Sequence, residues 1–264
     1  MQVMLRLIMS WTLLLFSSFA LAEFKRFVVE SGGNVSIPSG CVGSDQRIQL
    51  KNGIVEMVKS SGEVYRMGLD KQLGSLPVYI GSEGEPALCV LGFKYAENYV
   101  NETYAVHVFD QQSDRYSASR IGFVTNPDFS SGLIKNNYED GPVTYNDGLC
   151  FSKQKKDYYL CGRREQFTKN LEKVQRCGKL QCASSSIVKE GTNVSVSAVV
   201  ISSEASLFKK EGASHFERRH GYLVLGDEVV LTDFGQRESG LYYQVNFRGR
   251  SIGWIFSGDL RVKD

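Results

Sequence analysis

The sequence predicts a mainly β protein with an N-terminal antiparallel β sandwich or barrel, a smaller C-terminal barrel, and one short helix at the junction. The first observation behind this prediction is a series of short apolar or alternating runs separated by turn-forming residues. The second is composition, because 26 glycines, 13 tyrosines and 15 phenylalanines in 264 residues are typical of turns between aromatic strands. The third is the absence, between these runs, of the helical crossovers that a parallel sheet needs.

Composition also excludes several functions. Hydrophobic residues make up 42% of the chain and charged residues 23%, which is enough apolar material for a packed core. The 31 Lys and Arg residues nearly balance the 29 Asp and Glu residues and form no basic block, so we expect no nucleic-acid partner. With three histidines, a histidine-based metal or catalytic cluster is hard to build, and we expect no cofactor and no metal.

Residues 1–22 have the pattern of a signal peptide. One cation, Arg6, precedes an apolar run at residues 7–16, and residues 20–22 supply the small side chains of a cleavage site. The alternative, a transmembrane anchor, needs roughly 20 apolar residues, and this run is shorter. We therefore expect an exported protein, periplasmic or secreted, with no integral membrane segment after cleavage.

All six cysteines follow the predicted cleavage site, and an even set in an oxidising compartment indicates disulfides. Cys150 and Cys161 flank a hairpin tip at residues 153–156, which makes them cross-strand neighbours. Cys177 and Cys182 enclose a loop short enough to close on itself. Six cysteines allow 15 pairings, and sequence alone cannot choose among them. With these two local pairs, Cys41 and Cys89 remain and would pair by default, so the expected pairs are Cys41–Cys89, Cys150–Cys161 and Cys177–Cys182. The alternative, a zinc site built from the last four cysteines, lacks the closely spaced cysteine pairs that such sites favour.

The N-terminal region, from Phe24 to about Glu165, has the pattern of short strands and turns. Strands are expected at residues 48–50, 54–58, 78–80, 88–91, 104–109, 115–123 and 158–160. Turns are expected at residues 110–114, 126–128 and 139–142, where turn-forming side chains cluster. The short helix is expected within residues 163–176, because Phe167, Leu171 and Val174 fall on one face at helical spacing; the alternative is a simple connector.

A polar run at residues 183–186 marks the expected domain boundary, with a disulfide-bonded β domain at residues 23–183 and a second module at residues 184–264. Strands of the second module are expected at residues 194–201, 205–208, 221–231 with a turn at Gly226-Asp227, 241–247 and 251–256. Residues 209–219 are polar and are expected to form a loop.

The second module resembles the bacterial SH3-like (SH3b) family in four ordered motifs. They are Ala-x-Leu-Phe at residues 205–208, Tyr-Leu-x-x-Gly-Asp-x-Val at 222–229, Tyr-x-Val-x-Phe at 243–247 and Gly-Trp-Ile-x-x-x-Asp-Leu at 253–260. The resemblance implies an SH3-like barrel that binds cell-wall peptides or proteins, or serves as a spacer. It implies a ligand groove lined by aromatic side chains, for which the candidates are Phe208, Tyr222, Tyr242 and Trp254. Core packing is the favoured alternative for Trp254, and alternation leaves Tyr222 and Tyr242 open.

The N-terminal domain resembles, over about a third of its length, a periplasmic β family related to lysozyme inhibitors. The resemblance rests on the strand at 104–109 with its Asp turn, the Arg115-Tyr116 pair, and the Asn-Pro-x-Phe step at 126–129. The acidic Asn-Phe-Asp-Gly loop of that family is missing. The resemblance implies that the turn at 113–119 presents Asp114, Arg115 and Tyr116 to an enzyme; the alternative is an ordinary polar hairpin tip.

No catalytic constellation is evident in the chain. The cysteines are assigned to disulfides, His107 alone lies in the N-terminal domain, and no Gly-x-Ser-x-Gly elbow occurs. The carboxylates Glu83, Glu85 and Asp110 lie in turn-like stretches where acids are common.

We therefore expect a non-enzymatic, exported bacterial envelope protein whose partner is an envelope protein or peptidoglycan. Inhibition of, or immunity to, a wall-degrading enzyme would be such a role. The alternatives are a peptidoglycan hydrolase with an unfamiliar N-terminal catalytic domain and a structural envelope protein.

Overall fold

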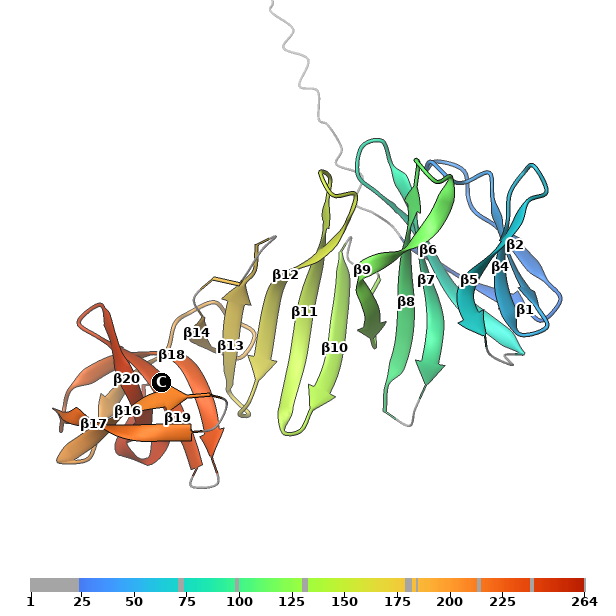
Figure 1. The fold of residues 1–264 in the computed structure, drawn as a ribbon. Helices are drawn as coiled ribbons and strands as arrows, with labels where there is room; N and C mark the ends of the chain where they lie inside the picture. Colours follow the sequence, from blue (N-terminus) through green and yellow to red (C-terminus); the bar gives the residue numbers. More distant parts are fainter. Residues whose placement is uncertain are drawn as a thin grey trace, which may run out of the picture.

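The computed structural model describes residues 24–70, 74–97, 100–129, 133–178, 182–183, 185–212, 215–237 and 240–263. In these segments 21 strands form four antiparallel sheets, and the single helical element is the 3-10 turn η1 (Ser257–Asp259). The sheets extend from an N-terminal pair to a C-terminal half-barrel in an elongated molecule (Figure 1). This confirms the mainly antiparallel β class. The predicted signal peptide lies outside the described residues.

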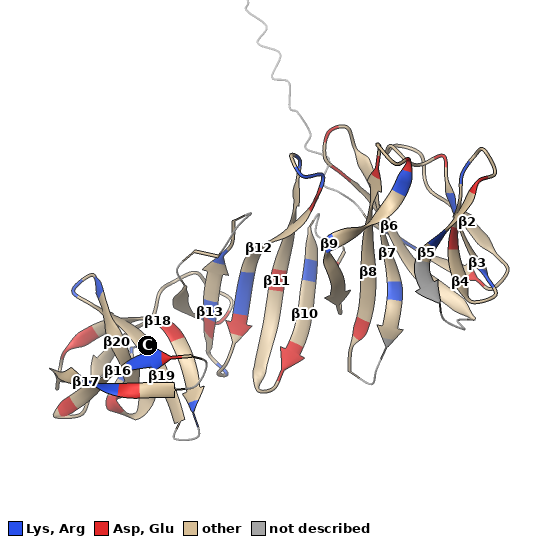
Figure 2. Ribbon diagram, in the orientation of Figure 1, with Lys and Arg blue, Asp and Glu red and all other residues tan. Residues whose placement is uncertain are grey.

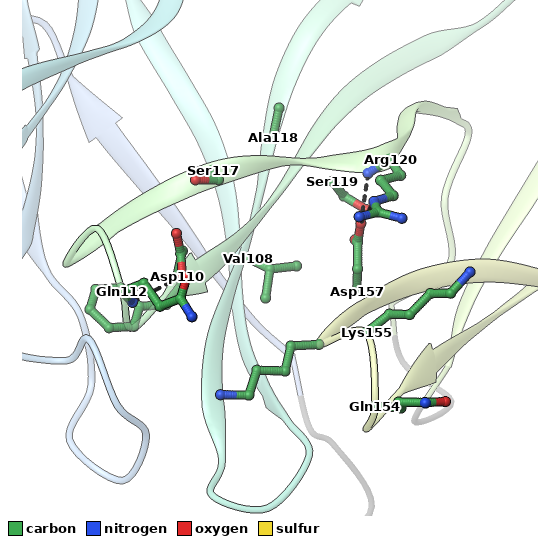
Figure 3. A pocket seen from close by; sticks show the side chains of 12 residues that line it. Val108, Asp110, Gln112, Ser117, Ala118, Ser119, Arg120, Gln154, Lys155 and Asp157 are labelled. Atoms are coloured by element: carbon green, nitrogen blue, oxygen red, sulfur yellow. Dashed lines mark hydrogen bonds and ion pairs between the residues drawn. The ribbon is translucent and has the colours of Figure 1, made fainter.

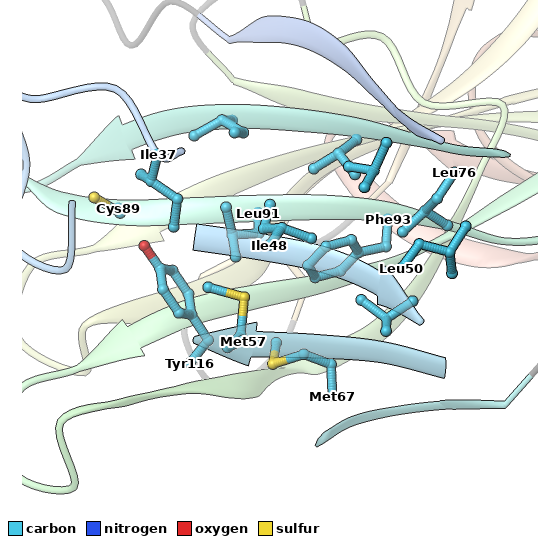
Figure 4. Close-up of a cluster of buried hydrophobic side chains, with 14 of the residues drawn as sticks. Ile37, Ile48, Leu50, Met57, Met67, Leu76, Cys89, Leu91, Phe93 and Tyr116 are labelled. Atoms are coloured by element: carbon cyan, nitrogen blue, oxygen red, sulfur yellow. The ribbon is translucent and has the colours of Figure 1, made fainter. Parts of the chain in front are cut away.

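The first two sheets pack face to face around one core. Their orders are β2-β3-β4-β5 and β1-β6-β7-β8-β9. The strands are β1 (Lys25–Glu30), β2 (Asn34–Ser36), β3 (Arg47–Lys51), β4 (Ile54–Val58), β5 (Val64–Asp70), β6 (Ser75–Glu83), β7 (Leu88–Glu97), β8 (Glu102–Asp110) and β9 (Arg115–Thr125). Ile48, Leu50 and Met57 from the smaller sheet meet Leu91 and Phe93 from the larger one (Figure 4). Residues 48 and 50 are both buried because side chains two apart on a strand share a face.

A second five-stranded sheet continues the molecule in the order β10-β11-β12-β13-β14. Its strands are β10 (Ile134–Asp140), β11 (Val143–Ser152), β12 (Asp157–Gln166), β13 (Leu171–Arg176) and β14 (Ser186–Lys189). Edge strand β9 of the preceding sheet lies against β10 and β12. A second core fills this contact, in which Val106 of β8 packs with Phe129, Ile134, Leu149 and Tyr158. The third sheet and the sandwich therefore share buried apolar surface.

The C-terminal sheet is a half-barrel of seven strands in the order β17-β16-β20-β19-β18-β15-β21. They are β15 (Ser197–Val200), β16 (Glu204–Glu211), β17 (His215–Val224), β18 (Glu228–Arg237), β19 (Gly240–Phe247), β20 (Arg250–Phe256) and β21 (Leu260–Val262). Its core contains Leu231, Val245 and Ile255, and Leu171 of the third sheet joins it. Strand β14 follows the domain boundary expected after residue 183 and pairs with β13 in the third sheet.

Specific side-chain contacts join the half-barrel to the third sheet. Phe167, in the β12–β13 turn, stacks on Phe234 of β18 with 3.8 Å between ring centroids. The Lys173 ammonium lies 2.9 Å from the Asp233 carboxylate of β18 and 3.3 Å from the Glu165 carboxylate of β12. Because the aromatic stack and the Lys173 ion pairs both join the β12–β13 hairpin to β18, the half-barrel has a defined position on the third sheet.

The helix expected within residues 163–176 is wrong, because this segment is the β12–β13 hairpin. Phe167 and Leu171 are four residues apart and would share a face of a helix, but Phe167 lies in the turn and Leu171 begins the next strand. Cross-strand charge pairs hold the hairpin, with Arg164 Nη1 2.6 Å from Glu172 Oε2. The apolar spacing therefore fits a strand–turn–strand unit as well as a helix.

The loop expected at residues 209–219 is also wrong, because its described residues, apart from Gly212 in a turn, belong to strands β16 and β17. Strand β17 is at the edge of the sheet, and within this segment only Phe216, among the described residues, is buried. A strand whose side chains are exposed to solvent on both faces has no alternation of apolar and polar residues, so its sequence resembles that of a loop.

The structure contains three disulfides, and they confirm the expected pairing of Cys41–Cys89, Cys150–Cys161 and Cys177–Cys182. Disulfides form and persist in oxidising compartments, so the chain belongs outside the cytoplasm. Within the described part of the chain, no helix has the length and apolar character needed to cross a bilayer.

Candidate binding site

Two hairpins enclose a hollow of about 510 Å³, which we call the hairpin groove. One wall is the β8–β9 hairpin, through residues 108–110, 112 and 117–120, and the other is the β11–β12 tip, through residues 154–157 (Figure 3). Both hairpin tips were expected from their turn residues. Their meeting was not, because it depends on the packing of two different sheets.

The turn of the first hairpin is stabilised by Asp110. Its carboxylate accepts hydrogen bonds from the Gln112 amide at 3.0 Å and from the Ser113 hydroxyl at 2.8 Å. These donors lower the pKa of Asp110 below its ordinary value, the Gln112 amide contributing most. Asp114 takes a φ of 51°, a left-handed conformation that Asp tolerates better than most residues. The expected turn at residues 110–114 is therefore confirmed.

Asp157 ties the two hairpins together across the groove. The Ser119 hydroxyl donates to Asp157 Oδ1, and the Arg120 amide donates to Asp157 Oδ2 at 3.0 Å (Figure 3). Lys156 Nζ donates to Gln111 Oε1 at 2.7 Å. The groove is therefore preformed rather than assembled by a ligand. Sequence reasoning missed Asp157, since an acid beside a lysine-rich turn is unremarkable without its long-range partners.

Strand β9 presents its outer edge to the groove. The Tyr116 amide points away from β8, because it donates to the Tyr65 hydroxyl at 2.9 Å. Residues 116–118 pair regularly with β8, so the Ala118 amide points the same way. Ala118 is exposed and lines the groove. The Ala118 amide is thus an outward-pointing donor on an extended strand. On one side of it the Tyr116 amide donates to Tyr65, and on the other the Arg120 amide donates to Asp157.

The groove carries more positive than negative side chains. Arg120 is 76% exposed, with its Nε atom 3.8 Å from Asp157 Oδ2, and Lys155 and Lys156 stand at the tip opposite it. Basic residues mark the β11–β12 tip in the charge-coloured ribbon (Figure 2). Among the acids that line the groove, Asp157 is already bonded by Ser119 and Arg120, and Asp110 is bonded within its own turn. The surface therefore suits an acidic segment.

The residues expected to meet a partner, Asp114, Arg115 and Tyr116, lie outside the groove lining and contact the four-stranded sheet. Asp114 Oδ2 is 2.8 Å from Lys59 Nζ, and the Arg115 guanidinium bonds Glu63. Tyr116 is buried and donates its hydroxyl to the Gly43 carbonyl at 3.1 Å. Burial raises the pKa of the Tyr116 hydroxyl. These three residues hold the hairpin in place.

The four aromatic residues expected to line a ligand groove in the second module do not share one surface. Phe208, Tyr242 and Trp254 pack with Phe216 in one cluster, in which the Phe216 and Tyr242 rings stack at 4.5 Å. Tyr242 is 6% and Trp254 7% exposed, so both are core residues, which confirms the alternative favoured for Trp254. Tyr222 is 55% exposed and lies apart from this cluster.

The carboxylates that were candidates for catalysis, Glu83, Glu85 and Asp110, each make a different structural contact. Glu83 accepts a hydrogen bond from the Tyr158 hydroxyl at 3.3 Å, and burial raises the pKa of Glu83. Glu85 pairs with Lys153 at 3.4 Å on the surface. Asp110 stabilises its own turn. In the described parts of the chain, no group of three or more His, Cys, Asp or Glu side chains could hold a metal ion.

No protein-family model, curated protein or solved structure matches this chain.

Proposed function

We propose that this is an exported, non-enzymatic binding protein of the bacterial envelope that holds a protein partner in the hairpin groove. The observation that carries the proposal is the outward Ala118 amide on edge strand β9, set in a preformed groove. An extended segment of a partner can add to such an edge through main-chain hydrogen bonds.

The charges around the groove favour an acidic partner segment. Arg120, Lys155 and Lys156 surround the Ala118 edge and are exposed to solvent. Complementary charge increases the rate of encounter and excludes basic partners. We assign the partner to the enzymes that degrade the cell wall, which the protein would inhibit or provide immunity against.

The half-barrel is assigned as an SH3-like module that anchors the protein to peptidoglycan or to a second protein. The order of its four motifs supports this, as does the use of Gly253. That residue has a φ of 147°, and a Cβ there would lie 2.9 Å from the Phe208 carbonyl. Only glycine suits this close crossing of β16 and β20, which brings Phe208 opposite Trp254.

The deciding experiment measures peptidoglycan degradation by a muramidase, an amidase and an endopeptidase, with and without the exported chain, and pelleting of that chain with sacculi. Stoichiometric inhibition of one enzyme supports the proposal. Release of muropeptides by the protein alone would establish the alternative hydrolase. No pelleting and no inhibition would leave the structural envelope role.

Replacing Ala118 by proline is expected to weaken the captured enzyme's affinity about tenfold, the value of roughly one hydrogen bond. Proline removes the outward donor but leaves the ladder to β8 intact, as edge strands allow. Ala118→Ser keeps the amide and serves as the matched control. Equal inhibition by both variants would contradict capture at this edge.

Reversing the charge of Lys155 to glutamate is expected to lower the association rate about tenfold at low salt, because the partner segment is acidic. The difference should shrink as ionic strength rises. Lys169→Glu, in the exposed β12–β13 turn outside the groove, is the control and should leave the rate unchanged. Stopped-flow binding distinguishes the two, and an unchanged rate for Lys155→Glu would exclude an acidic partner.

A further inference from the structure

A second hollow, of about 410 Å³, lies on the half-barrel at the edge strand β17. We call it the Arg–Tyr hollow. It is lined by Glu204, Arg218, Arg219, His220, Gly221 and Tyr222. It shares no residue with the hairpin groove, so it carries an inference that goes beyond the function proposed above.

A bulge in β17 builds the Arg–Tyr hollow. Tyr222 pairs with Ser206 and Arg218 with Phe208, so the residues 219–221 stand opposite Leu207 alone. Gly221 takes a φ of 120° at the end of the bulge, a conformation that favours glycine. Bulges turn side chains in new directions and are frequent beside functional sites. Here the bulge gathers two guanidinium groups, an imidazole and a phenol around one concave surface.

Positive charge exceeds negative charge in this hollow. Arg219 Nη1 donates to the Ile252 carbonyl at 3.0 Å, which fixes the guanidinium without neutralising it. Arg218 lies 3.9 Å from the Glu204 carboxylate, and both side chains are exposed, so this pair is weak. Guanidinium groups bind carboxylates and phosphates through paired hydrogen bonds. The group that fits between them is an acid.

Tyr222 indicates what kind of chemical group carries the acid. The residue is 55% exposed and lines the hollow with the two arginines, and its ring offers a flat face with a polar tip. Such a face packs against a sugar ring while its hydroxyl remains in water. An anionic membrane fits less well, because Asp227 and Glu228 follow the exposed Leu225 after a single glycine, Gly226. Glu228 is paired with Lys263 at 2.6 Å, which leaves Asp227 as the acid that would repel an anionic lipid surface.

We infer that the Arg–Tyr hollow binds an acidic sugar unit, with Arg218 and Arg219 on its acid group and Tyr222 against its ring. The hollow is of the size that holds a small ligand. The His220 imidazole completes the rim of the hollow.

Calorimetry with the exported chain tests this inference, using trigalacturonate, neutral maltotriose and inorganic phosphate as probes. We expect trigalacturonate to bind at least tenfold more tightly than maltotriose. Arg219→Gln, and separately Arg218→Gln, should weaken it at least tenfold. Arg261→Gln, an exposed arginine of β21 outside the hollow, should leave it unchanged.

Tyr222→Ala separates a sugar site from a bare anion site. We expect this variant to lose trigalacturonate affinity several-fold while its phosphate affinity stays as in the wild type. Equal binding of trigalacturonate and maltotriose would overturn the inference, as would binding to phosphatidylglycerol vesicles without any saccharide binding. Ala118→Pro should retain full trigalacturonate affinity, which separates failure here from failure of the hairpin groove.

Discussion

Replacing both Cys41 and Cys89 by serine is expected to lower the free energy of unfolding by about 4 kcal/mol, because this bond restricts a long loop in the unfolded chain. The two residues are 48 positions apart. The bond joins the segment between β2 and β3 to β7, where the Cys89 amide also donates to the Val42 carbonyl at 3.1 Å. Urea unfolding followed by fluorescence measures the change.

The Cys177–Cys182 bond provides the matched comparison, since its cysteines are only 5 positions apart. Removing it should cost about 2 kcal/mol by the same loop argument. A larger loss from the short loop than from the long one would contradict this account. The Cys41–Cys89 variant should also weaken partner capture, because Gly43, next to this bond, accepts the hydrogen bond of Tyr116 behind the hairpin groove.

Stability is expected to fall by about 3 kcal/mol as the pH decreases from 7 to 4, because His107 is buried in its neutral form. Burial lowers the pKa of His107 from 6.5 to about 4. Between these values the unfolded chain binds a proton that the folded chain excludes, so acid favours unfolding. Above pH 7 and well below pH 4 the contribution of His107 is constant. Unfolding measured in urea at several pH values gives the slope.

His107→Gln is the control for this prediction, since glutamine does not titrate. The side chain lies edge-on to Phe93, and its Nδ1 atom is buried without a hydrogen-bond partner. The variant should lose the pH slope between 6.5 and 4, whereas replacing the exposed His215 or His220 should preserve it. An unchanged slope in His107→Gln would assign the acid sensitivity to carboxylates instead.

Local sequence was sufficient for most strands and for the two short-range disulfides, whereas the Cys41–Cys89 pair followed only by elimination. The seven strands expected between residues 48 and 160 all occur, because a period of two in apolar side chains is a local property that tertiary packing then uses. The Cys150–Cys161 bond was predictable for the same reason, since it spans one hairpin. The helical spacing of Phe167 and Leu171 was misleading because Phe167 packs against Phe234, a residue far along the chain.

The candidate site was less predictable than the fold. The turn at residues 110–114 was expected, but Arg120 and Asp157 acquire their roles only when β9 and β12 meet. The resemblance to inhibitor-like proteins directed attention to Tyr116, which is a core residue in this chain. Likewise, Arg218 and Arg219 lie in a stretch expected to be a loop, and only the pairing with β16 reveals the bulge that gathers them. Long-range register is the information that composition and spacing lack.

The contacts between the half-barrel and the third sheet set the distance between the hairpin groove and the Arg–Tyr hollow. Phe167 stacks on Phe234, and Lys173 lies between Asp233 and Glu165, so the half-barrel is packed on the third sheet through specific contacts. A target that reaches both hollows meets them at a set span, so its second contact is intramolecular and gains avidity without new chemistry. Targets with the wrong spacing gain nothing. The protein would thus select targets by the spacing of their binding groups as well as by their charge.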